Sequence, residues 1–526
     1  MTGLLIAGTT SDAGKSAVTT GLCRALARRG IRVAPYKAQN MSNNSMVCVG
    51  SDGAPAEIGR AQWAQALAAG AVPEPAMNPV LLKPGTDRRS HVVLMGRPAG
   101  DVSSLDWETG RRHLAAAAHA AFDDLSARYD IVVAEGAGSP AEINLRDGDY
   151  VNMGLARHAG LPTIVVGDID RGGVFAAMYG TIALLSPEDQ ALIAGFAVNK
   201  FRGSAELLAP GLSSLSRLTG RRVFGVLPWD AGLWLDSEDA LDLEGRRADG
   251  SGSGAFSGRV RRVAVVRLPR ISNFTDVDAL GLEPDLDVTF ASGPRDIADA
   301  DLVVLPGTRS TISDLAWLRS RGLDRALADH ARRGRPLLGI CGGFQMLGSV
   351  IADPSGVEGD VGAAAEGLGL LRVRTDFGGA KRLGLPSGTG LGVPVAGYEI
   401  HHGRVTVDGT SGPDPGGSGL AVSGSAVSGS AVSASAEEFP GGVRDGNVFG
   451  TMWHGCLEGD EFRGAFLAAA FGGRVPSSAS FPAARQRRLD LLGDLVEEHL
   501  DVDALLDLAR SGPPAGLPVL PPAGKS

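Results

Sequence analysis

The segment from Gly8 to Ser16 limits the fold of this chain more than any other. Its residues are Gly8, Thr9, Thr10, Ser11, Asp12, Ala13, Gly14, Lys15 and Ser16. An apolar run precedes them, and a helical pattern follows as far as Ala27. A strand, a glycine-rich loop and a helix form a cradle for phosphate, because backbone N–H groups and the positive helix end point at the anion. The segment predicts a nucleotide-binding α/β domain, with Lys15 at the outer phosphates and Ser16 on Mg²⁺.

The spacing within this loop is unusual. Five residues separate Gly8 from Gly14, one more than in the commonest phosphate loop. The longer loop resembles that of the dethiobiotin synthetase branch of nucleotide-binding proteins. A glycine-rich turn with an exposed lysine is the alternative interpretation, but the flanking strand and helix favour a phosphate loop.

Length and composition limit the classes of function. A chain of 526 residues suggests about two to four domains, and 44% hydrophobic residues are typical of a soluble protein. The net charge of −9 gives no general attraction to nucleic acid or to an anionic membrane, so small-molecule partners are expected. Four irregularly spaced cysteines form neither a disulfide framework nor a zinc pattern. No apolar run approaches the ~20 residues of a spanning helix, and we expect a cytoplasmic protein.

Polar residues follow several predicted strands of the first half. In a doubly wound sheet, ligands collect at the carboxyl ends of the strands. Lys37 ends the second strand and is expected to meet a phosphate or a carboxylate. Glu135 ends a later, buried strand, where an acid is costly unless it meets a cation. Asp52 follows a loop rich in amides and hydroxyls, so Ser16, Asp52 and Glu135 form the predicted metal set, with loop capping as the alternative.

Two more strands, near 162–168 and 192–198, continue an alternation of strands and helices. Asn199 follows the second of them, and its amide is predicted to read the adenine base; a simple asparagine turn is the alternative. A last strand at 223–228 completes a mostly parallel, doubly wound sheet in a domain spanning 1–235.

The second half begins after a change in composition. Charged and then Gly/Ser-rich residues predict a linker at 236–260. A second α/β domain is predicted at 261–472, with a low-complexity, disordered insertion at 410–436. Residues 473–526 form a helical tail without chemistry of its own.

Cys341 lies in the most informative segment of the second domain. A predicted strand leads into Gly339-Ile-Cys341-Gly342-Gly343 and then a helix, the layout of a nucleophile elbow. The N–H groups of Gly342 and of Gly307, which ends another strand, are predicted to hold an oxyanion. A buried structural cysteine is the alternative, but the glycine frame favours a nucleophile.

A nucleophilic thiol needs a base, and a histidine ends a later strand. His454 is predicted to be the general base for Cys341. His401 and His402 are rivals for that role or for substrate contact.

Together the two halves resemble the cobyric acid synthase family, the glutamine-hydrolysing amidases of cobalamin biosynthesis. The resemblance covers about Thr2 to Gly472, and it is carried by residues 8–16, 37–45, 78–84, 167–173 and 338–345. It implies an α/β fold in two parts: a P-loop nucleotide-binding, doubly wound parallel sheet of dethiobiotin synthetase type, and a class I glutamine amidotransferase domain.

The resemblance also implies a reaction at two sites. Cys341, activated by His454, attacks the side-chain amide of glutamine and releases ammonia. In the first domain, Mg-ATP phosphorylates a carboxylate of adenosylcobyrinic a,c-diamide, and ammonia displaces the phosphate. The b, d, e and g side chains are amidated in turn, giving adenosylcobyric acid. The implied cofactors are ATP and Mg²⁺, the implied partners are glutamine and this corrinoid, and a homo-oligomer is left open.

One position departs from the usual pattern, and other functions stay open. Many class I amidotransferases have a glutamate two residues after the histidine, where this chain has Cys456; we assign no third catalytic residue. The nearest alternative is cobyrinic acid a,c-diamide synthase, which has the same two domains. A non-catalytic P-loop ATP-switch protein would need no nucleophilic cysteine. A third alternative is an inactive amidotransferase domain used only for regulation. In that case Cys341→Ala would leave the glutamine-dependent activity of the protein intact.

Overall fold

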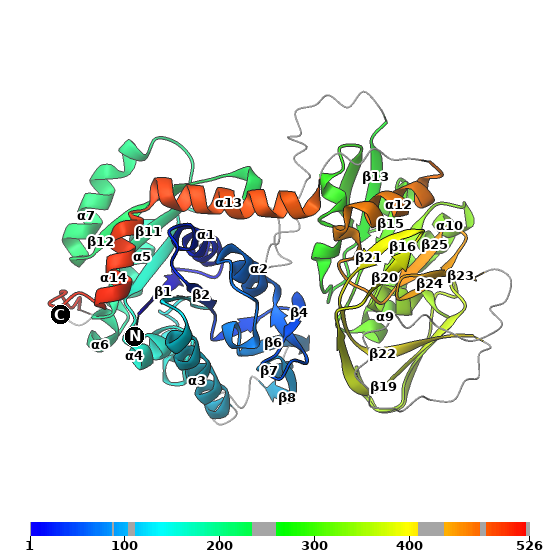
Figure 1. Ribbon diagram of the computed structural model, residues 1–526, viewed down its shortest axis with the longest axis horizontal. Coiled ribbons are helices and arrows are strands. Elements are labelled where there is room, and N and C mark those ends of the chain that lie inside the picture. Colours follow the sequence, from blue (N-terminus) through cyan, green and yellow to red (C-terminus); the bar gives the residue numbers. More distant parts are fainter. Residues whose placement is uncertain are drawn as a thin grey trace. The chain divides into compact units, whose positions relative to one another are not determined.

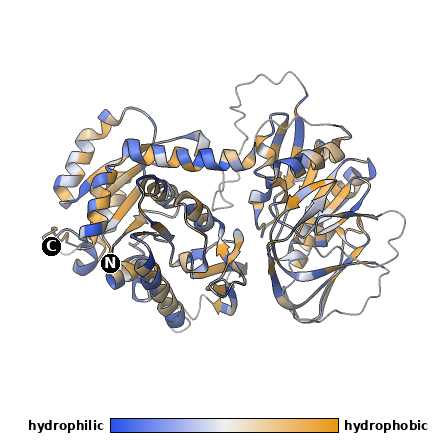
Figure 2. Cartoon of the chain, viewed as in Figure 1, coloured by the Kyte–Doolittle hydropathy of each residue, from blue (hydrophilic) through white to orange (hydrophobic). Residues whose placement is uncertain are grey.

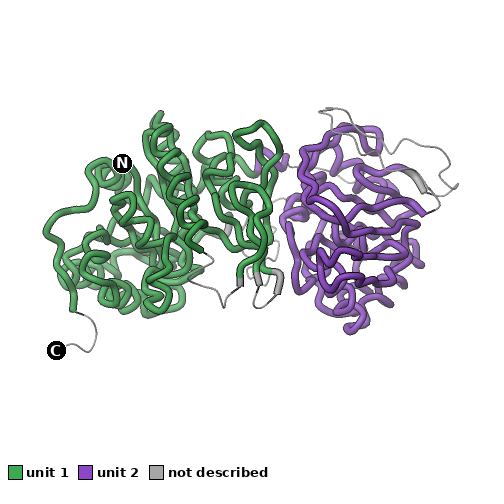
Figure 3. Tube along the Cα trace, turned by 90° about the horizontal axis from the view of Figure 1, so that it is seen from below, with its two compact units in different colours: residues 1–235, 485–526 green, residues 236–484 purple. Residues whose placement is uncertain are grey.

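The computed structural model describes residues 2–86, 89–103, 111–233, 259–408, 436–473 and 480–521. The chain forms two compact units, one of residues 1–235 with 485–526 and the other of residues 236–484 (Figure 3). The predicted linker at 236–260 and the predicted insertion at 410–436 lie outside the described residues, except for residues 259, 260 and 436. None of the helices in the described ranges is long and apolar enough to cross a bilayer.

A six-stranded sheet, all of whose pairings are parallel, forms the centre of the first unit (Figure 1). Its strands, in spatial order, are β12 (Arg222–Pro228), β11 (Ile193–Phe201), β10 (Thr163–Asp168), β1 (Gly3–Gly8), β9 (Ile131–Glu135) and β2 (Val33–Tyr36). Most of these strands are short runs of aliphatic residues, as expected for a parallel sheet with both faces covered. Figure 2 shows them coloured mainly as hydrophobic. The predicted doubly wound parallel sheet is confirmed.

Helices cover both faces of this sheet. They are α1 (Lys15–Arg28), α2 (Arg60–Ala68), α3 (Arg112–Arg128), α4 (Met153–Ala159), α5 (Val174–Ala183), α6 (Pro187–Gln190), α7 (Ala209–Thr219), α13 (Phe481–His499) and α14 (Val502–Ser511). Leu4 and Ile6 share a core cluster with residues of α1, α13 and α14. Gly3 approaches Phe122 of α3 instead, because alternate residues of a strand face opposite sides.

Two small sheets are inserted between β2 and α3. One has the order β3 (Gln39–Met41), β6 (Val80–Thr86), β7 (Arg89–Leu94) and β8 (Arg97–Ser103), and the other pairs β4 (Ser45–Val49) with β5 (Pro55–Gly59). Their interior is polar: the buried Glu57 carboxylate pairs with Lys83 and accepts a 2.8 Å hydrogen bond from Ser45. Pairing of this kind is what allows charge to be buried.

The C-terminal segment completes the core of the first unit. Leu489, Val496 and Leu505 pack in the same cluster as Val18 and Leu22 of α1. Ion pairs join α1 to α13 along the same side, with Arg24 and Arg28 at 2.6 and 2.9 Å from the Asp490 carboxylate. The sequence predicted helical structure here but not this packing.

The second unit has a seven-stranded sheet in the order β14-β13-β15-β16-β25-β24-β23, parallel from β14 to β25. These strands are β13 (Arg261–Val266), β14 (Leu286–Ala291), β15 (Leu302–Leu305), β16 (Leu337–Ile340), β23 (Ala436–Phe439), β24 (Gly442–Asp445) and β25 (Val448–Thr451). Its helices are α8 (Pro294–Ala298), α9 (Thr311–Ser320), α10 (Leu323–Arg332), α11 (Gly342–Leu347) and α12 (Asp460–Phe471). The predicted second α/β domain is confirmed.

Smaller sheets are inserted in sequence between β16 and β23 of this sheet. They contain β17 (Val350–Asp353), β18 (Ala363–Glu366), β19 (Val373–Gly384), β22 (Glu399–Val407) and the hairpin β20 (Ser387–Gly390) with β21 (Val393–Ala396). Short 3₁₀ turns in the chain include η2 (Ile143–Gly148), η6 (Phe274–Val277) and η8 (Cys456–Glu458).

The contact between α1 and α13 predicts an effect of a single methyl group. A Cβ atom at Gly21 would lie 2.4 Å from the Leu492 carbonyl oxygen. Gly21→Ala should therefore lower the thermal midpoint by roughly 2–8 °C, because overpacking outweighs the gain in helix propensity. Gly180 of α5 has open space around its Cβ position, so Gly180→Ala is the matched control and should not lower the midpoint. The thermal midpoints are measured by circular dichroism. A decrease of equal size in both variants would contradict the packing argument.

Candidate active sites

The glycine-rich loop of the first unit folds around the side chain of Lys15. The Lys15 ammonium donates to the carbonyls of Thr10 and Ser11, both at 2.9 Å, and to that of Gly138 at 3.2 Å. Gly14, at the start of α1, has φ of 94°, a left-handed conformation that favours glycine. The loop therefore lies between the end of β1 and the N-terminus of α1, as a phosphate cradle requires.

Glu135 lies at the end of β9, beside this loop, and is fully buried. Its Oε1 accepts hydrogen bonds from Ser16 Oγ and from Lys37 Nζ, both at 2.8 Å. Its Oε2 accepts a 2.6 Å hydrogen bond from Gln65 Nε2. The structure thus brings Ser16, Lys37 and Glu135 together. The Ser16 hydroxyl and the Glu135 carboxylate are the oxygen ligands that Mg²⁺ prefers, so this pair fits a nucleotide-bound magnesium ion.

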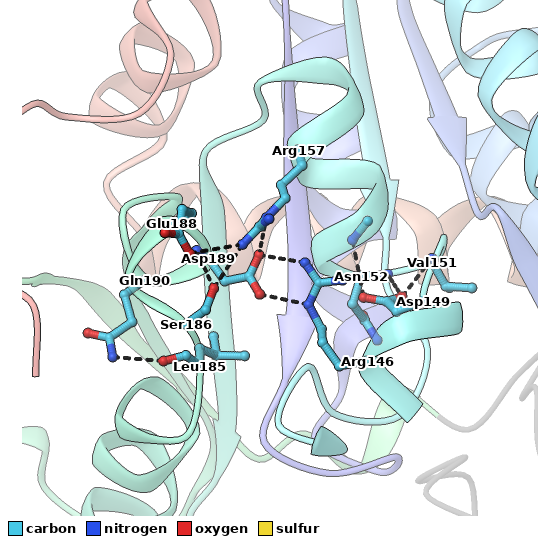
Figure 4. A network of polar contacts seen from close by, with 11 residues as sticks. Arg146, Asp149, Val151, Asn152, Arg157, Leu185, Ser186, Glu188, Asp189 and Gln190 are labelled. Carbon is cyan, nitrogen blue, oxygen red and sulfur yellow. Dashed lines mark hydrogen bonds and ion pairs between the residues drawn. The ribbon is translucent and has the colours of Figure 1, made fainter. Parts of the chain in front are cut away.

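Asp149 and Asn152 lie in a polar network near the ion pairs of Asp189 with Arg146 and Arg157 (Figure 4). Asn152 donates to the Ala137 carbonyl at 2.7 Å, and a Cβ atom at Gly136 would lie only 2.1 Å from Asn152 Oδ1. Asp149 accepts the backbone N–H of Asn152 at 2.8 Å. These contacts fix the backbone directly after the buried acid.

The structure places two predicted residues elsewhere or in another role. Asp52 lies in an exposed turn between β4 and β5, where it accepts the Ala54 N–H at 3.0 Å and pairs with Arg97 at 2.9 Å. It is not brought to Ser16, because it caps its own turn, and we leave it out of the metal set. Asn199 donates its amide to the Ala13 carbonyl at 3.0 Å. That contact supports the loop, and the role of Asn199 at adenine stays a prediction.

Cys341 occupies a strained turn between β16 and α11. Its φ of 49° and ψ of −110° are unusual for a residue other than glycine. The glycines beside it are needed for space: a Cβ at Gly343 would lie 1.9 Å from the Leu305 carbonyl oxygen, and one at Gly342 would lie 2.7 Å from Thr308 Cγ2. This geometry is that of a nucleophile elbow.

His454 follows β25, and the Cys341 side chain is close enough to raise the pKa of its imidazole. Its Nδ1 donates to Asp276 Oδ2 at 2.7 Å, which leaves Nε2 as the ring nitrogen for the thiol. Asp276 Oδ1 accepts the Gly455 N–H at 2.8 Å, and Tyr398 stacks on the imidazole with centroids 5.2 Å apart.

The electrostatics of this group favour charge separation. Burial alone would lower the pKa of His454, but the Asp276 carboxylate and the Cys341 sulfur raise it to about 10. The imidazole is therefore protonated at neutral pH, and its positive charge lies beside the Cys341 side chain.

The predicted oxyanion residues also lie at this site. A Cβ at Gly307 would be 3.0 Å from His454 Cε1, and one at Gly342 would be 3.0 Å from the Thr308 nitrogen. The structure thus brings Cys341, His454, Gly307 and Gly342 together. The rival histidines His401 and His402 lie on β22, where His401 Nδ1 bonds the Gly403 carbonyl at 2.8 Å.

Sequence reasoning missed Asp276. It lies in the short turn η6, and 178 positions separate it from His454. No spacing rule links the two residues, and the usual position of a third residue, two after the histidine, is Cys456. The one sequence signal is an acidic residue between apolar Phe274 and Val277; the structure shows that this segment is buried.

Comparison with known proteins agrees with this division. Residues 4–241 match the CobQ/CobB/MinD/ParA nucleotide-binding domain, and residues 262–462 match the CobB/CobQ-like glutamine amidotransferase domain. The chain is 72% identical over 522 residues to a cobyric acid synthase of Mycolicibacterium gilvum, with 99% of each chain covered. It is 71% identical to that of Mycolicibacterium vanbaalenii and 70% identical to that of Mycobacterium tuberculosis, with 99% of each chain covered in both comparisons.

The charge arrangement predicts a distinctive pH dependence of thiol reactivity. In the wild type, the rate of Cys341 alkylation by iodoacetamide should change little between about pH 6 and 9, because the His454 imidazolium keeps its charge over this range. Asp276→Asn removes the charge that raises the His454 pKa, so burial should leave the imidazole largely neutral at pH 7, and alkylation at that pH should slow by at least roughly tenfold. The rate should then rise with pH, as for an ordinary thiol.

Two features make this measurement specific. Burial raises the pKa of Cys23, Cys48 and Cys456, so the reaction reports on Cys341. Asp299→Asn changes an exposed acid of the same unit and should leave the profile unaltered. A flat profile in Asp276→Asn as well would show that Asp276 does not hold the His454 proton.

Proposed function

The chain belongs to the cobyric acid synthase family, and on that basis we propose that it uses ATP and glutamine to convert adenosylcobyrinic a,c-diamide into adenosylcobyric acid. The carboxylates amidated are those of the b, d, e and g side chains. The main support from the geometry is that Cys341 interacts with His454, which is hydrogen-bonded to Asp276, beside two glycines and in the same chain as a phosphate loop.

The second unit would release ammonia from glutamine. The Cys341 thiolate attacks the carbon of the side-chain amide, and the negative oxygen is held by the N–H groups of Gly307 and Gly342. The His454 imidazolium gives its proton to the departing nitrogen, which leaves as ammonia. Water, deprotonated by the now neutral imidazole, hydrolyses the thioester to glutamate and restores the thiolate. Asp276 keeps the ring in one orientation throughout.

The first unit would activate the carboxylate of the corrinoid. Bound Mg-ATP supplies a phosphoryl group that turns a poor electrophile into one that ammonia can attack. Lys15 and the N-terminus of α1 would bind the phosphates, and Ser16 with Glu135 would hold the metal ion. Lys37 lies at the same strand edge, bonded to Glu135, and balances the acid's charge.

The first test separates the two sites. Cys341→Ala should reduce the rate of glutamine-dependent amidation of adenosylcobyrinic a,c-diamide to below roughly a thousandth of the wild-type rate, because the nucleophile is gone. The ammonia-dependent reaction should remain, and wild type should add four amides, measured by product mass and ADP formation. Cys456→Ala, which removes another buried thiol of the same unit, is the matched control and should keep the glutamine-dependent reaction.

The other outcomes are equally informative. Amidation of cobyrinic acid at a and c, with no reaction of the a,c-diamide, would assign the chain to the alternative synthase. No amidation of either substrate would contradict the proposal. Full glutamine-dependent activity in Cys341→Ala would show that the amidotransferase unit is not the source of ammonia.

A second test concerns the metal ligands. Glu135→Gln should weaken Mg²⁺-dependent binding of ATP by at least roughly tenfold, measured by calorimetry, because a carboxylate ligand is lost. Hydrolysis of glutamine in the second unit should persist and show that the variant folds. Asp52→Asn should leave ATP binding unchanged, since Asp52 pairs with Arg97 instead. Equal effects of the two substitutions would argue against the assignment of Glu135.

A further inference from the structure

Two glutamines of helix α2, in the first unit, carry buried polar atoms that the steps above do not use. Gln62 and Gln65 are both completely buried, and as residues i and i+3 they lie on one face of the helix. The atoms Gln62 Nε2 and Gln65 Oε1 have no hydrogen-bond partner among the described residues. A buried donor or acceptor without a partner is costly and rare in proteins, so these two atoms point to a ligand.

Neighbouring side chains fix the orientation of both amides. Gln65 Nε2 donates to Glu135 Oε2 at 2.6 Å, and an ionised carboxylate only accepts, so Oε1 is the atom left for a ligand. Gln62 Oε1 accepts a 2.9 Å hydrogen bond from Asn40 Nδ2, which leaves its Nε2 in the same way. This face of α2 therefore presents one donor and one acceptor. Because Gln65 bonds Glu135 directly, the acceptor lies at the proposed metal and phosphate site.

The donor and the acceptor match a primary amide. The oxygen of such an amide accepts from a donor like Gln62 Nε2, and its N–H donates to an acceptor like Gln65 Oε1. A carboxylate has no N–H and would satisfy only the donor. The pair is thus complementary to the group that amidation produces, and to the adduct that precedes it, rather than to the starting carboxylate. Binding of this kind lowers the barrier of the chemical step.

The charges around the acceptor favour neutral ammonia. A carboxylate beside ammonia would stabilise ammonium, which has no lone pair for attack. Here the charge of Glu135 is balanced by Lys37 at 2.8 Å, and its second oxygen is bonded to Gln65 Nε2. Gln65 Oε1 is a neutral acceptor, so it can bind an N–H group without favouring protonation of the nitrogen.

We infer that Gln65 Oε1 accepts a hydrogen bond from the ammonia that attacks the acyl phosphate, while Gln62 Nε2 donates to the carbonyl oxygen of the acyl phosphate. The lone pair of the nitrogen forms the C–N bond, and the C–O bond to phosphate breaks with its electrons going to the phosphate. One proton of the nitrogen passes to the departing phosphate, so the products are a carboxamide and hydrogen phosphate. The inference rests on the proposed function and names the residues that position its nucleophile.

The first test varies ammonia at constant pH with the full-length protein, Mg-ATP and adenosylcobyrinic a,c-diamide. In Gln65→Met, kcat/KM for ammonia should fall roughly 10- to 100-fold, the effect of losing one buried hydrogen bond. Acyl phosphate formation, measured without ammonia by positional isotope exchange in labelled ATP, should change by less than about threefold. The affinity for Mg-ATP, measured by calorimetry, should be unaltered, because Glu135 keeps its bonds from Ser16 and Lys37.

A second variant should give a different pattern. Gln62→Glu keeps the oxygen that Asn40 bonds and replaces the Nε2 donor. The carbonyl oxygen needs this donor both when the acyl phosphate forms and when ammonia attacks. Isotope exchange and amidation should therefore both slow by roughly 10- to 100-fold, with the affinity for Mg-ATP unaltered. Gln486→Met changes an exposed glutamine of α13 in the same unit and should alter none of these values.

Each other result overturns the inference. A loss of Mg-ATP affinity in Gln65→Met would make Gln65 a metal ligand or a support of Glu135. Equal losses of isotope exchange and amidation in that variant would place its role before ammonia arrives. Unaltered kinetics in both variants would assign the two atoms to an ordinary buried water. A wild type that amidates no corrinoid with ammonia would refute the proposed function as well, whereas wild-type amidation with an indifferent Gln65→Met would refute only this inference.

Discussion

Glu135 and Asp276 are carboxylates with almost no exposure to water, and the chemistry of each unit depends on how each is paired. An isolated buried charge is so costly that the chain must surround it with donors. Glu135 receives hydrogen bonds from Ser16, Lys37 and Gln65, which come from a loop, a strand end and a helix. Satisfying the acid therefore also fixes the positions of the groups around the phosphate loop.

Asp276 acts in the same way in the second unit. Its two oxygens bond the ring of His454 and the next backbone N–H, so the imidazole cannot rotate. The negative charge also keeps that ring protonated, against the effect of burial. Asp276 thus determines both the orientation and the charge of the His454 ring.

Much of this arrangement followed from the sequence, because parallel strands deliver their last residues to one edge. That rule correctly placed Ser16 beside Glu135. It also placed Cys341, in its glycine frame, beside a histidine that follows another strand. It failed for Asp52, which lies in a hairpin turn that places its acid in solvent. It could not find Asp276, because only the folded chain brings that turn to His454. The docking of the C-terminal helices on α1 depends on the surface shape around Gly21, which no periodicity encodes.

The strain at Cys341 shows why the second site is built from so many rigid neighbours. A non-glycine residue with φ of 49° and ψ of −110° costs about 1–3 kcal/mol and persists only where its surroundings leave no alternative. Here the Cys341 N–H donates to the Thr451 carbonyl at 2.7 Å, and its own carbonyl accepts the N–H of Gln345. Both bonds would break if the turn relaxed, and the backbone of β15 lies too close to Gly343 for any side chain there. The hydrogen bonds on both sides of Cys341 therefore hold its sulfur toward His454. The stability of the sheet and of α11 maintains a backbone conformation that Cys341 alone would not adopt.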